Sequence, residues 1–446
     1  MLDVLVVGSG LCGTLAAKHL EGKGRSVLVL EGGPGLPPAL PGDVVGFQRA
    51  VAPIARSVDQ AWAFRAPKGY EWHRVRARGG RTLLWGGWME RPPKDYFDAR
   101  RKTGAAWPHT LAVELDGWIR RAEKALTVRT GRRGPLHRKL AALGHKAATK
   151  RESVLIGQRR MLTAADVSLR SEVRCDSPVV RIEATSEGLI AITASGEALS
   201  ARRVVLAASP IETARILEFS LPEKQRRRRI DVFDHLIAGA IAIAPRERAG
   251  VHPLDAAEPS AVMHPPPTSR ARFTTEVRGP TPLESLDAED LKNLGFTVEE
   301  AAKHSFYVVF AMGETDAATP RQVEFDARSL DGLGRPSPRF VARAHTRTEA
   351  SLGKQMNRQV LGLARQLASS RERAFLIYDA LDFSSGGHEV GTCLDRIDEN
   401  GHVTGLPGVY VADGAGVPAA TDRHPSLTLA ANALRVADAL ARSMKS

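Results

Sequence analysis

The sequence has 446 residues, which is enough for two domains or for one domain with a large insertion. Hydrophobic residues make up 43% and charged residues 25%, as in soluble globular proteins, and no apolar run is long enough to span a bilayer. The net charge of +13 could favour acidic partners, but aromatic residues are only 5% and no nucleic-acid-binding signature occurs. We therefore expect a basic surface and no nucleic acid partner.

The cysteines and the first predicted strand bear on the cellular compartment. Cys12, Cys175 and Cys393 are too far apart in the sequence for a paired metal or redox motif. A strand that begins at Asp3 leaves no room for a signal or transit peptide. We therefore expect a cytoplasmic protein with reduced thiols.

The first 31 residues follow the order strand, glycine turn, helix, strand, acid. Residues 3–7 form an apolar run typical of a strand buried on both faces, and residues 14–21 are helical in pattern. A second apolar run, 26–30, ends at Glu31, which lies 31 − 8 = 23 residues after the first glycine. That spacing is near the usual distance for an acid that binds the ribose of a dinucleotide.

The turn itself, residues 8–13, has glycines at the three positions that such a site needs. Gly8 allows the tight turn, Gly10 lets backbone N–H groups approach a pyrophosphate, and Gly13 lets the helix pack close to the strand. The helix N-terminus adds partial positive charge for the phosphates. This glycine pattern alone is weak evidence, but its strand, helix and acid favour dinucleotide binding over a tight turn without a ligand.

A second glycine-rich loop occupies residues 79–88. Four glycines in nine residues do not favour a helix, and they suit a backbone that passes close to a flat or anionic group. Leu83, Leu84, Trp85 and Trp88 favour burial, which argues against an irregular surface loop.

The middle of the chain has a helical pattern first, then strand-like runs, and then a second helical pattern. A helix is predicted from residue 110 to 126, followed by strands at 179–182, 189–193 and 203–208 and a helix at 211–218, which gives a second strand-to-helix crossover. Four arginines, residues 226–229, are predicted to lie on a solvated loop.

Residues 231–385 alternate strand-like runs with Pro- and Gly-rich turns and end in a helix at about 349–367, as in a mixed sheet backed by helices. The C-terminal segment returns to the opening pattern, with a strand that ends at Asp413 and a helix that begins at Pro425. The sequence thus predicts an α/β fold in which a discontinuous nucleotide-binding domain contains an inserted α+β domain.

Five segments in this order resemble the glucose–methanol–choline (GMC) oxidoreductases, and most closely their pyranose-oxidase-like branch. The segments are residues 8–13 with Glu31, the loop 79–87, Val180 with 204–217, residues 388–393, and residues 411–414 with 424–428. Ser209 stands where a glycine is usual in the family, and Asp234–His235 matches a family D-H pair. Residues 101–165 and most of 231–385 match only in outline.

The resemblance implies a Rossmann-like FAD-binding domain made of residues 1–100, 165–225 and 386–446, and a substrate domain made of 101–164 and 226–385. It also implies the residues that contact FAD. These are Gly8, Gly10, Leu11, Cys12, Gly13, Glu31, Gly80, Arg81, Thr82, Trp85, Val180, Asp413, Gly414, Pro425 and Ser426. Some relatives carry a histidine that bonds covalently to the flavin, but Leu84 stands at that place, so we expect non-covalent FAD.

The chemistry implied by the resemblance is oxidation of a CH–OH group of a small-molecule alcohol, sugar-like or a specialised metabolite. Flavin N5 accepts the hydride, and His388 is the expected general base because an imidazole titrates near physiological pH. His424 is the expected second hydrogen-bond partner of the substrate oxygen. Oxygen or another acceptor would reoxidise the flavin.

Two alternatives follow from the same residues. A lyase of the hydroxynitrile-lyase type would use the same histidine as a base without flavin redox chemistry. A flavin-binding protein without activity is disfavoured, because both histidine positions are filled. No metal site is expected.

Overall fold

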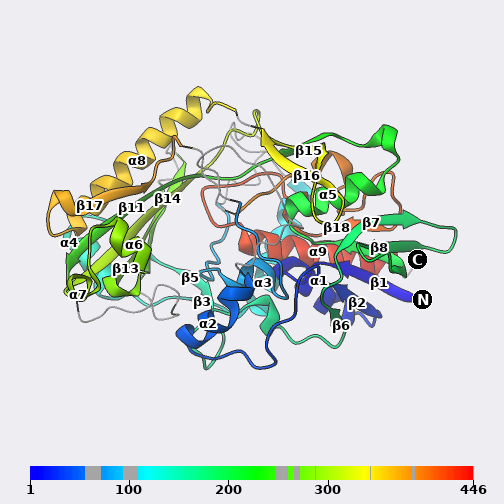
Figure 1. The fold of residues 1–446 in the computed structure, drawn as a ribbon, viewed down its shortest axis with the longest axis horizontal. Helices are drawn as coiled ribbons and strands as arrows, with labels where there is room; N and C mark the ends of the chain where they lie inside the picture. Colours follow the sequence, from blue (N-terminus) through cyan, green and yellow to red (C-terminus); the bar gives the residue numbers. More distant parts are fainter. Residues whose placement is uncertain are drawn as a thin grey trace.

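The computed structural model describes residues 1–55, 72–93, 109–247, 255, 260–265, 272–286, 288–341, 343–382 and 387–444. Two large sheets dominate it, and they lie at opposite ends of the long axis (Figure 1). Both chain termini lie at the end of the molecule that holds the first sheet. Within the described residues, no helix has both the length and the apolar character needed to cross a membrane.

The first sheet has seven strands and is parallel at its centre. Its strands are β6 (Glu172–Arg174), β2 (Val27–Leu30), β1 (Leu2–Val7), β9 (Ala198–Leu206), β8 (Leu189–Thr193) and β7 (Val179–Ala184) in that order, with β18 (Val409–Val411) also paired to β9. β6, β2, β1, β9 and β18 are parallel, whereas β8 and β7 continue the sheet antiparallel. The C-terminal strand β18 therefore joins the sheet that begins at the N-terminus.

Side chains of β1 alternate between two cores, as the pleat of a strand requires. Val4 and Val6 pack against α1 (Leu11–Gly22) and α9 (Ser426–Ser443) on one face. Leu5 and Val7 pack on the other face, where α5 (Pro210–Ser220) lies. α3 (His109–Ala125) packs outside α9. The sheet is thus covered on both sides, as expected for an apolar parallel sheet.

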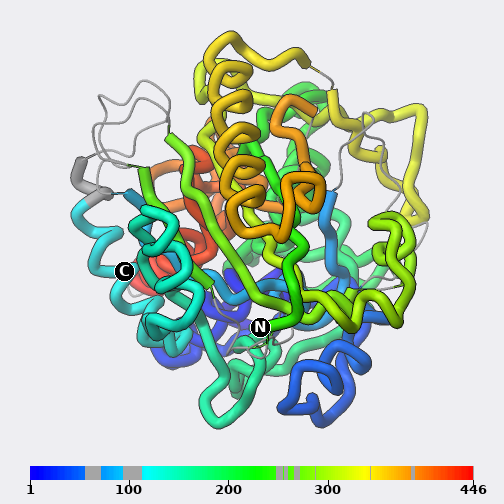
Figure 2. Tube along the Cα trace, turned by 90° about the vertical axis from the view of Figure 1, so that its left-hand side faces the viewer, coloured from blue at the N-terminus to red at the C-terminus, as the bar shows by residue number. Residues whose placement is uncertain are grey.

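The second sheet is antiparallel and has six strands. Their order is β17 (Ala374–Tyr378), β11 (Leu236–Pro245), β14 (His304–Gly313), β13 (Phe273–Pro282), β12 (Ser260–Met263) and β4 (Ala148–Thr149). The amphipathic helix α8 (Arg347–Leu367) packs on one face, and Figure 2 shows it lying along the strands. α6 (Ala288–Asn293) and α7 (Val298–Ala301) cover one end of the other face. The remaining part of that face lies toward the first sheet. The mixed α/β architecture agrees with the predicted fold class.

Smaller elements connect these two units. They are α2 (Val44–Ala55), α4 (Pro135–Ala142) and two short paired strands, β3 (Val128–Thr130) and β5 (Arg151–Ser153). α2 was not predicted, because the Pro- and Gly-rich composition of residues 32–78 hides its periodicity.

A three-stranded sheet of β10 (Arg229–Val232), β15 (Arg321–Leu330) and β16 (Pro336–Val341) lies where the sequence predicted part of the substrate domain. Its apolar side chains share one core with β1, β9 and α5. Arg215 of α5 joins the same core to the β15–β16 turn, because it pairs with Glu212 at 2.7 Å and with Asp331 at 3.0 Å. This packing places the small sheet against the first sheet. The division into an FAD-binding domain and a substrate domain stays a prediction.

The arginine run 226–229 differs from the predicted solvated loop. Arg227 pairs with the buried Glu218 at 2.7 Å and also contacts Asp395, and Arg229 begins β10. At least part of the run therefore holds β10 to α5.

Candidate active site

The turn after β1 tolerates only glycine at two of its positions. Gly8 has a φ of +103°, and a Cβ there would lie 2.3 Å from the Ala207 carbonyl oxygen. A Cβ at Gly13 would lie 1.9 Å from the Gly8 carbonyl oxygen. Both distances are far below van der Waals contact, so these glycines bring β1, β9 and the first turn of α1 together.

Glu31 closes the same turn from the end of β2. Its Oε2 accepts hydrogen bonds from the Ser9 N–H at 3.0 Å and the Ser9 hydroxyl at 2.7 Å, and its Oε1 accepts one from the Gly33 N–H at 3.0 Å. Burial raises the pKa of Glu31 against the opposing effect of these hydrogen bonds. Because a carboxylate offers about four acceptor positions, Oε1 can still accept a ribose hydroxyl.

Gly10 differs from Gly8 and Gly13, because a Cβ there would meet no atom of the described residues within 4 Å. The second glycine loop lies beside it. The Gly79 N–H donates to the Ser9 hydroxyl at 3.2 Å, and a Cβ at Gly80 would lie 3.1 Å from the Gly10 Cα. The structure therefore brings the two glycine segments together around an open space at the N-terminus of α1. An anionic group can enter this space and meet backbone N–H groups.

The glycine loop is held by its own polar side chains. Thr82 donates to the Gly79 carbonyl at 2.6 Å and accepts from the Ala164 N–H at 2.8 Å, so its hydroxyl has two protein partners. The indole N–H of Trp85 donates to the Leu162 carbonyl at 2.9 Å.

Arg81 connects this loop to the segment that carries His388. Its guanidinium pairs with Glu389 at 2.6 Å, donates to the Ser209 hydroxyl at 3.1 Å and contacts the Gly387 carbonyl. These contacts occupy the guanidinium within the protein, so Arg81 fixes the loop against the residues next to His388.

Asp413 lies at the end of β18 and is almost fully buried. Its carboxylate accepts from the Thr213 hydroxyl at 2.7 Å and the Ala415 N–H at 2.9 Å. Burial raises its pKa to about 6 despite these hydrogen bonds. Gly414 follows, where a Cβ would lie 2.9 Å from the Glu389 carbonyl oxygen. Asp413 thus fixes the turn after β18 to α5, and this turn packs against the His388 segment through the hydrogen bond from the Gly391 N–H to the Gly414 carbonyl at 2.8 Å.

The remaining predicted cofactor residues lie near these groups. Leu11 and Cys12 begin α1, and Pro425 precedes Ser426, the first residue of α9. Val180 lies on β7, three residues after Ser177, whose N–H donates to the Glu31 carbonyl at 2.8 Å.

Three histidines from separate segments meet between the two sheets. The ring of His388 lies 5.1 Å from that of His424 and 5.1 Å from that of His235, in edge-to-face arrangements. Among the described residues, no group forms a hydrogen bond with the buried Nδ1 of His388. His424 directly precedes Pro425 and the N-terminus of α9. The structure therefore brings the two predicted catalytic histidines together and adds a third.

A buried carboxylate completes this group. Glu276, on β13, is 2% exposed, and its Oε1 lies 2.7 Å from Nε2 of His424. Burial alone would raise the pKa of Glu276, but His424, Arg278 and Lys150 together lower it below its usual value. Arg278, two residues on, lies 3.5 Å from the second oxygen of Glu276. Trp88 packs beside His424 with ring centroids 5.3 Å apart.

Sequence reasoning did not assign roles to Glu276, His235 or Trp88. β13 was not predicted, and nothing in the sequence around Glu276 indicates a partner 148 residues away at His424. The Asp234–His235 pair was noted as a family match and was the only available signal.

Buried neutral histidines are expected to make stability depend on pH. Burial, and then the neighbouring His424, lowers the pKa of His235 to about 3, and burial with Arg423 lowers that of the partly buried His264 to about 4. Below about pH 6.5 the unfolded chain binds protons that the folded chain does not, so stability is lost as the pH falls. Each such histidine contributes a slope of about 1.4 kcal/mol per pH unit between pH 6 and 5.

Chemical denaturation at several pH values between 7 and 5 measures this slope. His235→Asn should reduce this slope by about 1.4 kcal/mol per pH unit, the contribution of one proton. An unchanged slope in His235→Asn would show that His235 binds a proton as readily in the folded chain as in the unfolded chain.

Cys12 lies in the first turn of α1, but burial raises the pKa of its thiol, and Asp413 adds to this effect. Burial likewise raises the pKa of Cys393 to about 12, which agrees with a packed residue and not a nucleophile.

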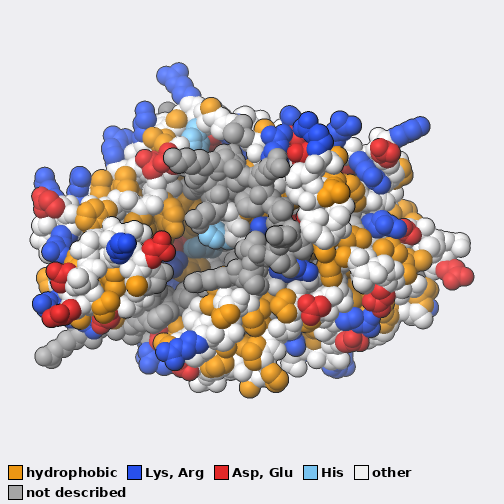
Figure 3. Space-filling view, in the orientation of Figure 1, with side chains coloured by type: hydrophobic (Ala, Val, Ile, Leu, Met, Phe, Trp, Pro, Cys, Tyr) orange, Lys and Arg blue, Asp and Glu red, His pale blue; other side chains and the backbone are white. Residues whose placement is uncertain are grey.

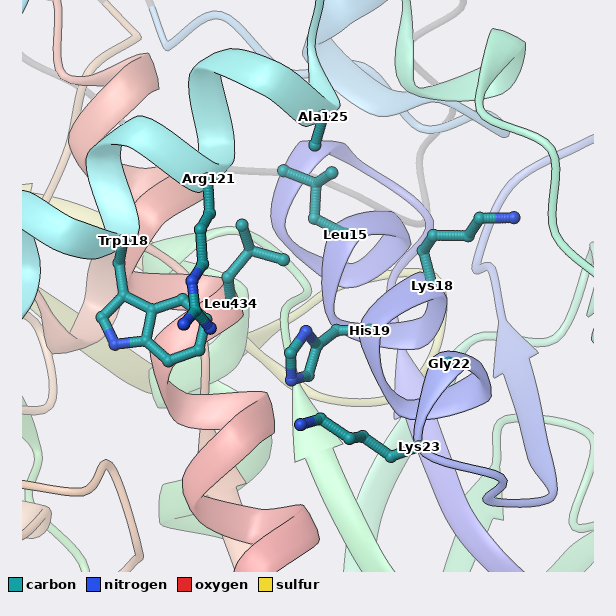
Figure 4. Close-up of a pocket in the computed structure, with 9 residues that line it drawn as sticks. All are labelled: Leu15, Lys18, His19, Gly22, Lys23, Trp118, Arg121, Ala125 and Leu434. Carbon is teal, nitrogen blue, oxygen red and sulfur yellow. The ribbon is translucent and has the colours of Figure 1, made fainter.

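A separate surface hollow of about 330 Å³ lies between α1, α3 and α9 (Figure 4). Its lining includes His19, Lys23 and Trp118 but none of the predicted site residues. His19 and Lys23 pair with Asp438 of α9 at 3.0 and 3.1 Å. These pairs connect the two helices, so the hollow is a helix junction.

Comparisons with known proteins agree with this geometry. No family model matches the chain. Paromamine 6'-oxidase from Streptomyces fradiae is 34% identical over 151 residues, a match that covers 31% of this chain and only 27% of that protein. Pyridoxine 4-oxidase from Mesorbium loti superposes with a TM-score of 0.71 at 17% identity, over 100% of this chain and 99% of that one. The chain thus has the fold of pyridoxine 4-oxidase.

Proposed function

We propose that the protein is an FAD-dependent oxidoreductase that oxidises the CH–OH group of a small-molecule alcohol to a carbonyl. The observation that carries this proposal is the contact between the rings of His388 and His424, two residues from different segments of the chain. Next to His388, Glu389 forms an ion pair with Arg81 of the glycine loop. The two named relatives are both oxidases, which supports the same class of reaction.

The described residues fit an FAD molecule. Gly10 leaves a space that a side chain would fill, and Glu31 keeps an acceptor position for the ribose. The segment around Gly80 and Arg81 would lie along the flavin ring, and the N-terminus of α9 would face the ring edge that becomes negative on reduction. Bound there, FAD would supply the hydride acceptor.

The histidines would manage the proton of the substrate hydroxyl. Burial, and then the neighbouring His235 and His424, lower the pKa of His388 well below its usual value. Its imidazole is therefore neutral at physiological pH and can accept the hydroxyl proton. Oε1 of Glu276 lies 2.7 Å from Nε2 of His424, so the nitrogen of His424 that would form a hydrogen bond with the substrate oxygen is Nδ1. The ion pair with Glu276 would hold that ring in place.

An anaerobic flavin-bleaching screen tests the proposal. Purified holoprotein is mixed with sugars, glycosides, aliphatic and aromatic alcohols, sterols and hydroxy acids, and the flavin absorbance is followed. Bleaching by one class is expected and would identify the substrate type. If none bleaches a flavin that dithionite still reduces, the oxidoreductase proposal fails for these classes, and cyanohydrin cleavage becomes the assay for the lyase alternative.

We further propose that FAD is bound non-covalently. Leu84 packs against an apolar cluster and offers no nucleophile to the flavin. Precipitation of the holoprotein with acid should therefore release all the yellow FAD into the supernatant. Colour that remains in the washed pellet would contradict this expectation.

A further inference from the structure

The face of the six-stranded sheet opposite α8 carries a row of aligned residues. Glu276 of β13 is paired with Phe310 of β14, Phe310 with Gly239 of β11, and Gly239 with Tyr378 of β17. Residues directly opposite each other in antiparallel strands project from the same face. The row therefore runs across the sheet from Glu276, which contacts His424, to the edge strand β17.

The outer part of this row is a flat aromatic surface. The rings of Phe310 and Tyr378 stack with centroids 5.9 Å apart and planes inclined by 26°. Gly239 lies between them, and a Cβ there would lie 2.8 Å from the Tyr378 ring and 3.1 Å from the Phe310 ring. The absence of a side chain at Gly239 thus permits the two rings to meet. Tyr378 is 46% exposed, so the surface is open to solvent.

A second line of planar groups connects this surface to the candidate catalytic histidines. The Arg278 guanidinium lies 5.8 Å from the centre of the Phe310 ring and 4.9 Å from the centre of the Trp88 ring. Trp88 in turn packs beside His424. In Figure 3 the surface is hollowed between the two halves of the molecule, with hydrophobic side chains on the wall formed by the half that carries this sheet.

We propose that Phe310 and Tyr378 form a subsite that binds a ring of the alcohol substrate remote from the carbon that is oxidised. This inference rests on the proposed function, which places the reacting carbon at His388 and His424. Adjacent strands lie about 4.8 Å apart, so Phe310 lies about 5 Å and Tyr378 about 14 Å across the sheet from Glu276, and the midpoint of the two rings lies about 10 Å from it. The substrate class is therefore an alcohol whose CH–OH group is joined, through a linker or a first ring, to a ring about 10 Å away.

Binding of model alcohols to the holoenzyme tests the subsite. The probes are 6-phenyl-1-hexanol, which carries a ring at a suitable distance, and 1-hexanol, which lacks the ring. Dissociation constants are measured by equilibrium dialysis with the His388→Ala holoenzyme, which should bind alcohols without oxidising them. Anaerobic flavin reduction in the unmodified holoenzyme is measured in parallel.

Tyr378→Ala and Phe310→Ala should each weaken binding of 6-phenyl-1-hexanol by roughly threefold to tenfold, the effect of losing one aromatic contact, with no change for 1-hexanol. Gly239→Ala should act in the same direction by separating the rings. Leu376→Ala is the matched control, because Leu376 lies on the same strand with 38% exposure but pairs with Ala240, whose side chain packs on the α8 face. It should leave both probes unaffected.

The outcomes separate this inference from the proposed function. Equal weakening for both alcohols, or no weakening for either, would overturn the subsite. A change of oligomeric state in Tyr378→Ala, seen by sedimentation without a change in binding, would also overturn it in favour of a contact between copies. Ring-dependent binding without flavin reduction would support the subsite while the oxidation proposal fails, and flavin reduction without ring dependence would give the reverse result.

Discussion

Replacement of His388 by alanine is expected to slow flavin reduction by the alcohol substrate roughly 10²- to 10⁴-fold, the usual contribution of a general base. The expectation rests on its burial, on its neutral imidazole and on its position against His424 and His235. FAD should stay bound, because the glycine segments and Glu31 belong to other parts of the fold. Anaerobic stopped-flow absorbance measures the rate, and the flavin-to-protein ratio measures FAD content.

His145→Ala is a suitable control for the effect of losing an imidazole. His145 is partly buried, and its ring forms a hydrogen bond with Gln366 on α8, far along the chain from the histidine cluster. Its rate of flavin reduction should equal that of the unmodified protein. Near-normal reduction in His388→Ala would remove His388 as the base, whereas loss of FAD would assign it a structural role.

His424 offers a graded comparison. Asparagine there keeps a hydrogen-bonding side chain but cannot form the ion pair with Glu276. A smaller effect in His424→Asn than in His388→Ala would support the assignment of His388 as base and His424 as the second partner.

The nucleotide-binding turn could be predicted because its signals are local. The turn between β1 and α1 needs glycines at fixed positions, and the crowding at Gly8 and Gly13 shows why no other residue fits. β1, α1 and β2 follow each other directly, so their periodicities define them without tertiary information. The return of the C-terminal strand β18 to the same sheet was also visible, because its apolar run and terminal acid repeat the opening pattern.

Contacts set by long-range register could not be predicted. Glu276 reaches His424 because β13 pairs with β14 in one register, and no residue near Glu276 in the sequence indicates that pairing. The Gly-Pro step within β13 also interrupts the alternation that would have revealed the strand.

Replacement of Gly10 by alanine is expected to weaken FAD binding at least about tenfold while leaving the fold of the protein intact. A Cβ at Gly10 meets no protein atom within 4 Å, and its φ of −69° is one that alanine adopts freely. Alanine is a poorer N-cap than glycine, so we expect the free energy of unfolding of the FAD-free protein to fall by no more than about 1 kcal/mol. The added methyl group matters only if a ligand approaches the backbone there.

Alanine substitutions at Gly13 and Gly22, two other glycines of α1, are the comparisons for Gly10→Ala. Gly13→Ala places a Cβ 1.9 Å from the Gly8 carbonyl oxygen, so it should destabilise the FAD-free protein as well as prevent FAD binding. Gly22→Ala, in the last turn of α1 with open space around it, should change neither property adversely. FAD affinity is measured by quenching of flavin fluorescence, and stability by denaturation of the FAD-free variants. Normal FAD affinity in Gly10→Ala would show that the pyrophosphate does not cross the turn, and the glycine pattern would then serve only the packing of α1 on β1.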